Sequence, residues 1–177
     1  MRSNTIIIDN HGNGFEAVIA ESKKVAVYVE MQPEAYGHMQ LLIEEMLSVV
    51  KGATDDLEAS FWIECEDGAY DLHLNAKTEL NKEQRYHLLS TTTSGKNEAA
   101  NTFHGRLRAR FEEARASEVD HDYDELPQEL LADLPMTPIE DPVEDGYERK
   151  ILKKVADSVK IGILRGVVDV VVSKKYT

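Results

Sequence analysis

Two hairpin signals constrain the fold of this chain more than any other feature. Residues 61–74 alternate apolar and polar side chains on both sides of Asp67-Gly68, a dipeptide typical of a tight β-turn. Residues 159–172 repeat the arrangement around Arg165-Gly166, with many β-branched side chains. Each signal predicts two neighbouring antiparallel strands.

The remaining segments predict helices and one more strand. Residues 5–9 indicate a buried strand, followed by a glycine-rich loop. Apolar side chains recur at the helical period from Phe15 to Val29, and Pro33 opens a second helix with an apolar stripe that continues to Val50 and a predicted stop at Gly52. Further helices are expected over residues 82–90, 100–114 and 151–155.

This order of elements favours one architecture. Parallel strands need single crossover connections, whereas hairpins interspersed with helix pairs favour an antiparallel arrangement. We therefore expect an α+β fold, a two-layer sandwich in which one mixed, mainly antiparallel sheet carries its helices on one face.

An acidic segment interrupts this pattern. Residues 117–146 contain 11 Asp and Glu and no Lys or Arg, together with four of the five prolines. Like charges and prolines oppose a packed core, so we expect an insertion or linker with at most a short helix over residues 127–133. Residues 1–116 and 147–177 are then expected to form a single domain.

Composition limits the partners. The formal charge of −13 disfavours binding to nucleic acid or to an anionic membrane, and no apolar run is long enough to span a bilayer. The single cysteine, Cys65, cannot form an intramolecular disulfide. These features predict a cytoplasmic protein, leave a protein partner open, and do not indicate an oligomeric state.

A family resemblance rests on the second predicted helix. Glu44 and Ser48 are four residues apart and share one helix face. With the order of elements, this pair resembles the Glu-x-x-x-Asn box of the ATP-binding domain of histidine kinases, gyrase B, Hsp90 and the anti-sigma-factor kinases, the GHKL family, with serine in place of asparagine. The resemblance implies a Bergerat-like fold, in which Glu44 is the catalytic residue and Ser48 a ligand of Mg²⁺. A solvated helix face is the alternative interpretation.

Two further stretches match that family less fully. Asn75 stands near the family's adenine-binding Asp-x-Gly-x-Gly turn, but the glycines are missing; alternatively, Asn75 belongs to a strand end. Ser94, Gly95, Lys96 and Asn97 resemble the family's lid region and have the small hydroxyl, glycine and cation that suit a phosphate. An ordinary helix entry explains the same four residues equally well.

Two functions follow as expectations. The first is a divergent GHKL-type domain that binds ATP and Mg²⁺ and acts in regulation, with weak or no ATPase or protein kinase activity. The second, alternative function is a protein-interaction module of the same α+β fold that binds no nucleotide. The missing asparagine and glycines favour the second function, whereas Glu44, the loop at Ser94-Gly95-Lys96 and the order of elements favour the first, which is the function that we expect.

Overall fold

The computed structural model describes residues 1–9, 11–54, 58–100 and 146–177. Its strands are β1 (Ile6–Asp9), β2 (Glu58–Glu66), β3 (Ala69–Lys77), β4 (Ser158–Leu164) and β5 (Val167–Lys175). Its helices are α1 (Phe15–Tyr28), α2 (Pro33–Ala53), α3 (Lys82–Ser90), the 3₁₀ turn η1 (Glu98–Ala100) and α6 (Gly146–Val155). Both predicted hairpins are confirmed, and α2 continues past Gly52 to Ala53.

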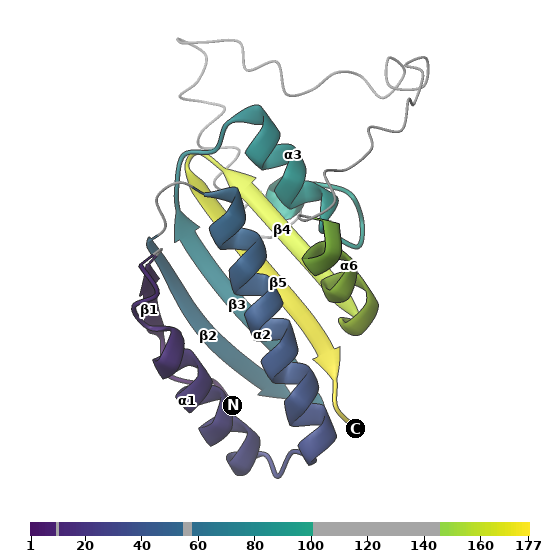
Figure 1. The fold of residues 1–177 in the computed structure, drawn as a ribbon. Helices are drawn as coiled ribbons and strands as arrows, with labels where there is room; N and C mark the ends of the chain where they lie inside the picture. Colours follow the sequence, from purple (N-terminus) through teal and green to yellow (C-terminus); the bar gives the residue numbers. More distant parts are fainter. Residues whose placement is uncertain (10, 55–57, 101–145) are drawn as a thin grey trace.

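The five strands form one sheet in the order β1-β2-β3-β5-β4, and every neighbouring pair is antiparallel. α1 and α2 form a helical hairpin that connects β1 to β2, and β2 lies antiparallel to β1. Figure 1 shows α1, α2 and α6 on the same face of the sheet. The predicted α+β two-layer sandwich is thus confirmed, and the mainly antiparallel sheet is wholly antiparallel among the described strands.

Both hairpin turns have the geometry that their sequences predict. Asp67 and Gly68 have φ values of 47° and 74°, and Arg165 and Gly166 have φ values of 43° and 72°. Two consecutive positive φ angles define a type I′ turn, whose twist matches that of the adjoining strands. The turns therefore fix the register of both hairpins.

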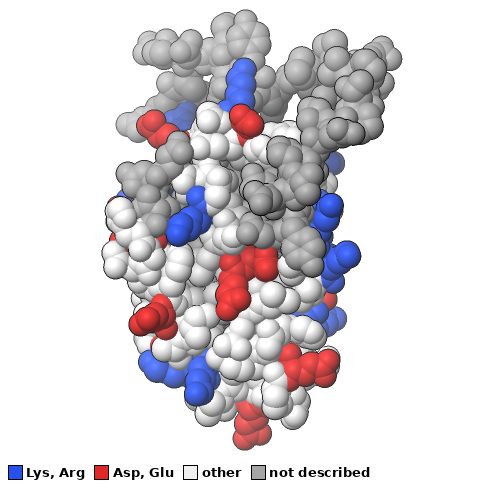
Figure 2. Space-filling view, viewed as in Figure 1, with Lys and Arg blue, Asp and Glu red and all other residues white. Residues whose placement is uncertain are grey.

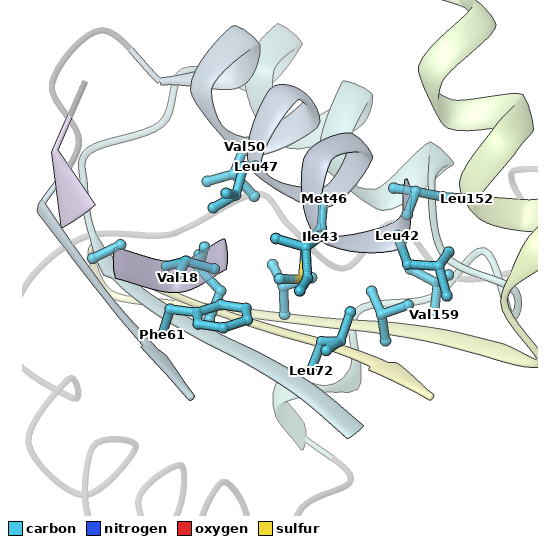
Figure 3. Close-up of a cluster of buried hydrophobic side chains, with 14 of the residues drawn as sticks. Val18, Leu42, Ile43, Met46, Leu47, Val50, Phe61, Leu72, Leu152 and Val159 are labelled. Carbon is cyan, nitrogen blue, oxygen red and sulfur yellow. The ribbon is translucent and has the colours of Figure 1, made fainter. Parts of the chain in front are cut away.

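The core lies between α2 and the sheet (Figure 3). Leu42, Ile43 and Met46 on α2 are fully buried and point toward the sheet, where Phe61 and Leu72 meet them. In β2 and β3 every second residue is buried, so one face of the sheet packs against the helices. The opposite face carries the alternating residues, which include Trp62, His73 and Asn75.

Part of the sequence prediction lies outside the described residues. These parts are the acidic segment up to residue 145, its expected helix over residues 127–133, and the helix expected over 100–114 beyond Ala100. Only Gly146, where α6 begins, falls within the structure. Among the described residues, no helix is both long enough and apolar enough to cross a membrane.

Gly14 sits at the point where the chain turns from β1 into α1. Its φ is 88°, and a Cβ at this position would lie 2.1 Å from the carbonyl oxygen of Ile7. The start of α1 therefore packs directly over the backbone of β1, which only glycine permits.

Gly14→Ala should destabilise the protein through both strain and steric overlap. A positive φ costs a non-glycine residue about 1–2 kcal/mol, and overpacking adds about 1–3 kcal/mol. Gly12→Ala is the matched control, because Gly12 has a φ of 89° with no atom within 4 Å of the added Cβ. Urea denaturation should show the larger loss of unfolding free energy for Gly14→Ala; equal losses would contradict the close approach to Ile7.

Glu21 ties the segment before β1 to α1. Its carboxylate, 9% exposed, accepts hydrogen bonds from the backbone N–H of Asn4 at 3.1 Å, from Asn4 Nδ2 at 2.9 Å and from Lys24 Nζ at 2.9 Å. The bond from Lys24, reinforced by those from Asn4, lowers the pKa of Glu21 although burial acts to raise it. The ionised carboxylate of Glu21 is therefore the form that binds the segment before β1 to α1.

Stability should depend on the ionisation of Glu21. Because the folded pKa is lowered, the contribution is complete above the ordinary glutamate pKa and is lost as the pH falls through the lowered value. Glu21→Gln should cost about 1–2 kcal/mol at neutral pH and flatten the acid side of the stability profile. Thermal denaturation across pH measures this, with exposed Glu34→Gln as control; an unchanged profile for Glu21→Gln would refute the assignment.

Candidate functional site

A groove between α1 and α2 contains two of the predicted site residues. It has a volume of about 570 Å³ and is lined by Phe15, Glu16 and Ile19 of α1 and by Glu44, Leu47, Ser48 and Lys51 of α2. The two helices are antiparallel, so the start of α1 lies beside the second half of α2 (Figure 1). The structure thus places Glu44 and Ser48 together in a concave site.

The groove combines an apolar lining with a few polar groups. Phe15, Ile19 and Leu47 supply the apolar surface, and Lys51 Nζ lies 5.7 Å from the centre of the Phe15 ring. Glu16, Glu44 and Lys51 are exposed, whereas Ser48 is half-buried. An apolar cavity of this size with a few convergent polar groups is the usual form of a binding site.

The sequence predicts two of these seven residues, Glu44 and Ser48, as site residues and misses the other five. It places Phe15, Ile19 and Leu47 only in the apolar stripes of their helices, and Glu16 and Lys51 in no site. The signal for these residues is the helical hairpin: a short connection between two antiparallel helices places the start of α1 beside the second half of the longer α2. The groove is therefore formed by the helix pair and by neither helix alone.

Asn75 lies on the other face of the sheet. It alternates with the buried Leu74 and Ala76 along β3, and its Nδ2 donates a hydrogen bond to Asp169 Oδ1 on β5. Since Glu44 belongs to α2, on the helix-bearing face, the sheet separates the two residues. Asn75 is not among the residues that line the groove.

Asn97 binds the edge of β4. Its Nδ2 donates to the carbonyl oxygen of Ile163 at 2.8 Å, and its Oδ1 accepts from the N–H of Ile163 at 2.9 Å. Thr93 pairs in the same way with Val159, at 3.0 Å through its N–H and 3.3 Å through its Oγ1. These contacts cover an edge strand, whose unpaired backbone would otherwise be open to other chains.

Local contacts also occupy the loop before Asn97. Ser94 Oγ donates to Glu98 Oε1 at 2.8 Å and accepts from the N–H of Lys96 at 3.2 Å. Gly95 provides a φ of 68° for the turn, and Lys96 is exposed. The serine hydroxyl and the lysine N–H therefore already have partners, and one of these is a carboxylate, which repels phosphate.

The predicted site residues thus fall into three places. Glu44 and Ser48 line the α1–α2 groove, and Asn75 lies on the opposite face of the sheet. Ser94–Asn97 lie alongside β4, the edge strand farthest from β1. None of residues 75 and 94–97 contributes to the groove. In the described ranges, no three His, Cys, Asp or Glu side chains are grouped to hold a metal ion.

A stacked cluster lies on the sheet face away from α2, and in it His73 Nε2 is buried without a hydrogen bond among the described residues, 3.6 Å from Glu64 Oε2. Trp62 and His73 stack with ring centres 4.9 Å apart, and the Arg2 guanidinium lies 4.7 Å from the Trp62 ring. Glu64 accepts from Trp62 Nε1 at 3.0 Å. Burial lowers the pKa of His73, which keeps the imidazole neutral near pH 7. We interpret this cluster as packing that secures the N-terminal segment.

Comparisons with known proteins add no family assignment. None of the models of known protein families matches the chain, and no curated protein sequence is significantly similar to it.

Asn97→Ala should open the covered edge of β4. Loss of the two bonds to Ile163 should cost about 1–3 kcal/mol, at roughly 0.5–1.5 kcal/mol each, and should speed amide exchange at Ile163. Ser94→Ala is the control, because Ser94 bonds only within its own loop. Hydrogen exchange followed by NMR measures the effect; protection of Ile163 that survives Asn97→Ala would contradict this role.

Proposed function

We propose that this protein is an interaction module of the α+β fold that binds another protein and no nucleotide. The observation that carries the proposal is that the side-chain amide of Asn97 is already hydrogen-bonded to the edge of the sheet. Both polar atoms of its amide pair with Ile163, so this side chain is committed to the sheet edge. A nucleotide would have to displace these contacts before it could use Asn97.

The separation of the other residues supports the same proposal. Binding of ATP needs adenine, phosphate and metal contacts on one connected surface. Here Asn75 and Glu44 lie on opposite sides of the sheet. The loop at Lys96 lies alongside β4 at one edge of the sheet, whereas the groove lies between α1 and α2. The electrostatics point the same way, since Glu16 and Glu44 in the groove would repel a triphosphate.

Nucleotide binding of the histidine-kinase-like type is the second candidate. The observation that favours it is the presence of Glu44 and Ser48 in the α1–α2 groove, with Lys51 one turn beyond Ser48. In that case Glu44 would orient water, Ser48 would contact Mg²⁺, and Lys51 would meet a phosphate. Hydrolysis would be slow or absent, because a serine hydroxyl is a weaker metal ligand than the amide that it replaces.

Calorimetric titration with Mg-ATP separates the two candidates. The interaction module predicts no saturable heat at millimolar nucleotide, and unchanged amide exchange over residues 91–97. Saturable binding that Glu44→Ala and Ser48→Ala weaken, with Glu34→Ala as the control on the same helix, would overturn the proposal in favour of the nucleotide site.

A further inference from the structure

The groove between α1 and α2 has two carboxylates with no partner among the described residues. Glu16 stands on one wall and Glu44 on the other, and neither takes part in the ion pairs or hydrogen bonds of the described part of the chain. The one cation of the groove, Lys51, lies over the Phe15 ring. A ligand cation would therefore find two free acceptors on opposite walls.

The lining below these carboxylates suits an apolar stem. Phe15 and Ile19 face Leu47 from the other helix, and the groove holds about 570 Å³. Arginine and lysine bury an aliphatic stem on apolar surface while the charged end reaches polar groups. Arginine fits best, since its planar fork can reach carboxylates in two directions.

The position of the groove favours a peptide over a small molecule. Its charged residues Glu16, Glu44 and Lys51 are all exposed, so the groove opens to solvent. Closed pockets bury most of a small ligand, whereas an open groove between two helices suits side chains presented by a third helix.

The charge of the groove itself favours a basic partner. Its lining has two carboxylates, Glu16 and Glu44, and one cation, Lys51, whereas 11 of the 13 net negative charges of the chain belong to residues 117–146. Figure 2 shows Lys and Arg side chains along the edge of the molecule where Figure 1 places α6, with exposed Lys150, Lys153 and Lys154 on that helix. Since α1 lies on the far side of α2 from α6, α2 separates this positive surface from the groove.

We propose that the α1–α2 groove binds a basic amphipathic helix of a partner protein, with an arginine between Glu16 and Glu44 and apolar side chains on Phe15, Ile19 and Leu47. This inference rests on the proposed function, because it names the partner chemistry of the interaction module.

The test uses the full 177-residue chain and a synthetic helical peptide of about fifteen residues with leucines and one arginine on the same face. The matched peptide has glutamine in place of the arginine. Fluorescence anisotropy should show the arginine peptide binding at least about tenfold more tightly, with affinity that falls as salt is added. NMR shift changes should be confined to α1 and α2.

Variants of the protein locate the site. Glu16→Gln with Glu44→Gln should weaken the arginine peptide at least about tenfold and leave the glutamine peptide unchanged. Glu34→Gln, on α2 but outside the groove, should change neither. Because both substituted glutamates are exposed, the fold should persist, which circular dichroism checks.

Three results would overturn the inference: no binding of the arginine peptide at millimolar concentration, equal affinity for both peptides, or an affinity that the double variant does not change. Binding of arginine methyl ester as tight as that of the peptide would also overturn it, in favour of a small-molecule site. These failures leave the interaction module standing, whereas saturable Mg-ATP binding would remove the module itself.

Discussion

The packing of α2 against the sheet is the interaction on which the rest of the structure depends. Seven residues of this helix are buried, and they meet the buried residues of β2, β3 and β5. Each large side chain of this kind costs about 2–5 kcal/mol when truncated to alanine. Because α2 uses one face for the core, its flank toward α1 is left to form the groove with Glu44 and Ser48. The position of the candidate site is therefore a consequence of how the core is built.

The elements of the fold could be predicted where local chemistry decides them. Asp67-Gly68 and Arg165-Gly166 specify their turns through positive φ angles, and the apolar stripe of α2 specifies its buried face. The predicted stop at Gly52 lies one residue before the observed end of α2 at Ala53, which is within the range by which helix ends are defined. The order of strands in the sheet needed the structure, since pairing of β3 with β5 is non-local.

The candidate site was predictable only in part. The helical spacing of Glu44 and Ser48 places them on one face, and the structure keeps them together in the groove. Asn97 shows why the rest was not predictable: asparagine in a polar loop suits a phosphate, a helix cap or a strand edge equally well. Only the position of Ile163, far away in the sequence, decides that its amide serves the sheet. The residue types in the loop do not show on their own that Asn97 pairs with Ile163.

The pairing of β3 with β5 joins two parts of the chain that are far apart in sequence. Lys77 and Val167 are register partners, so the centre of the sheet closes a connection of roughly 90 residues, to which α3, η1, α6 and β4 belong. The entropy of loop closure grows only with the logarithm of length, about 0.6 kcal/mol for each doubling. A change in the length of this connection should therefore cost little closure entropy, provided that the strands on either side keep their register.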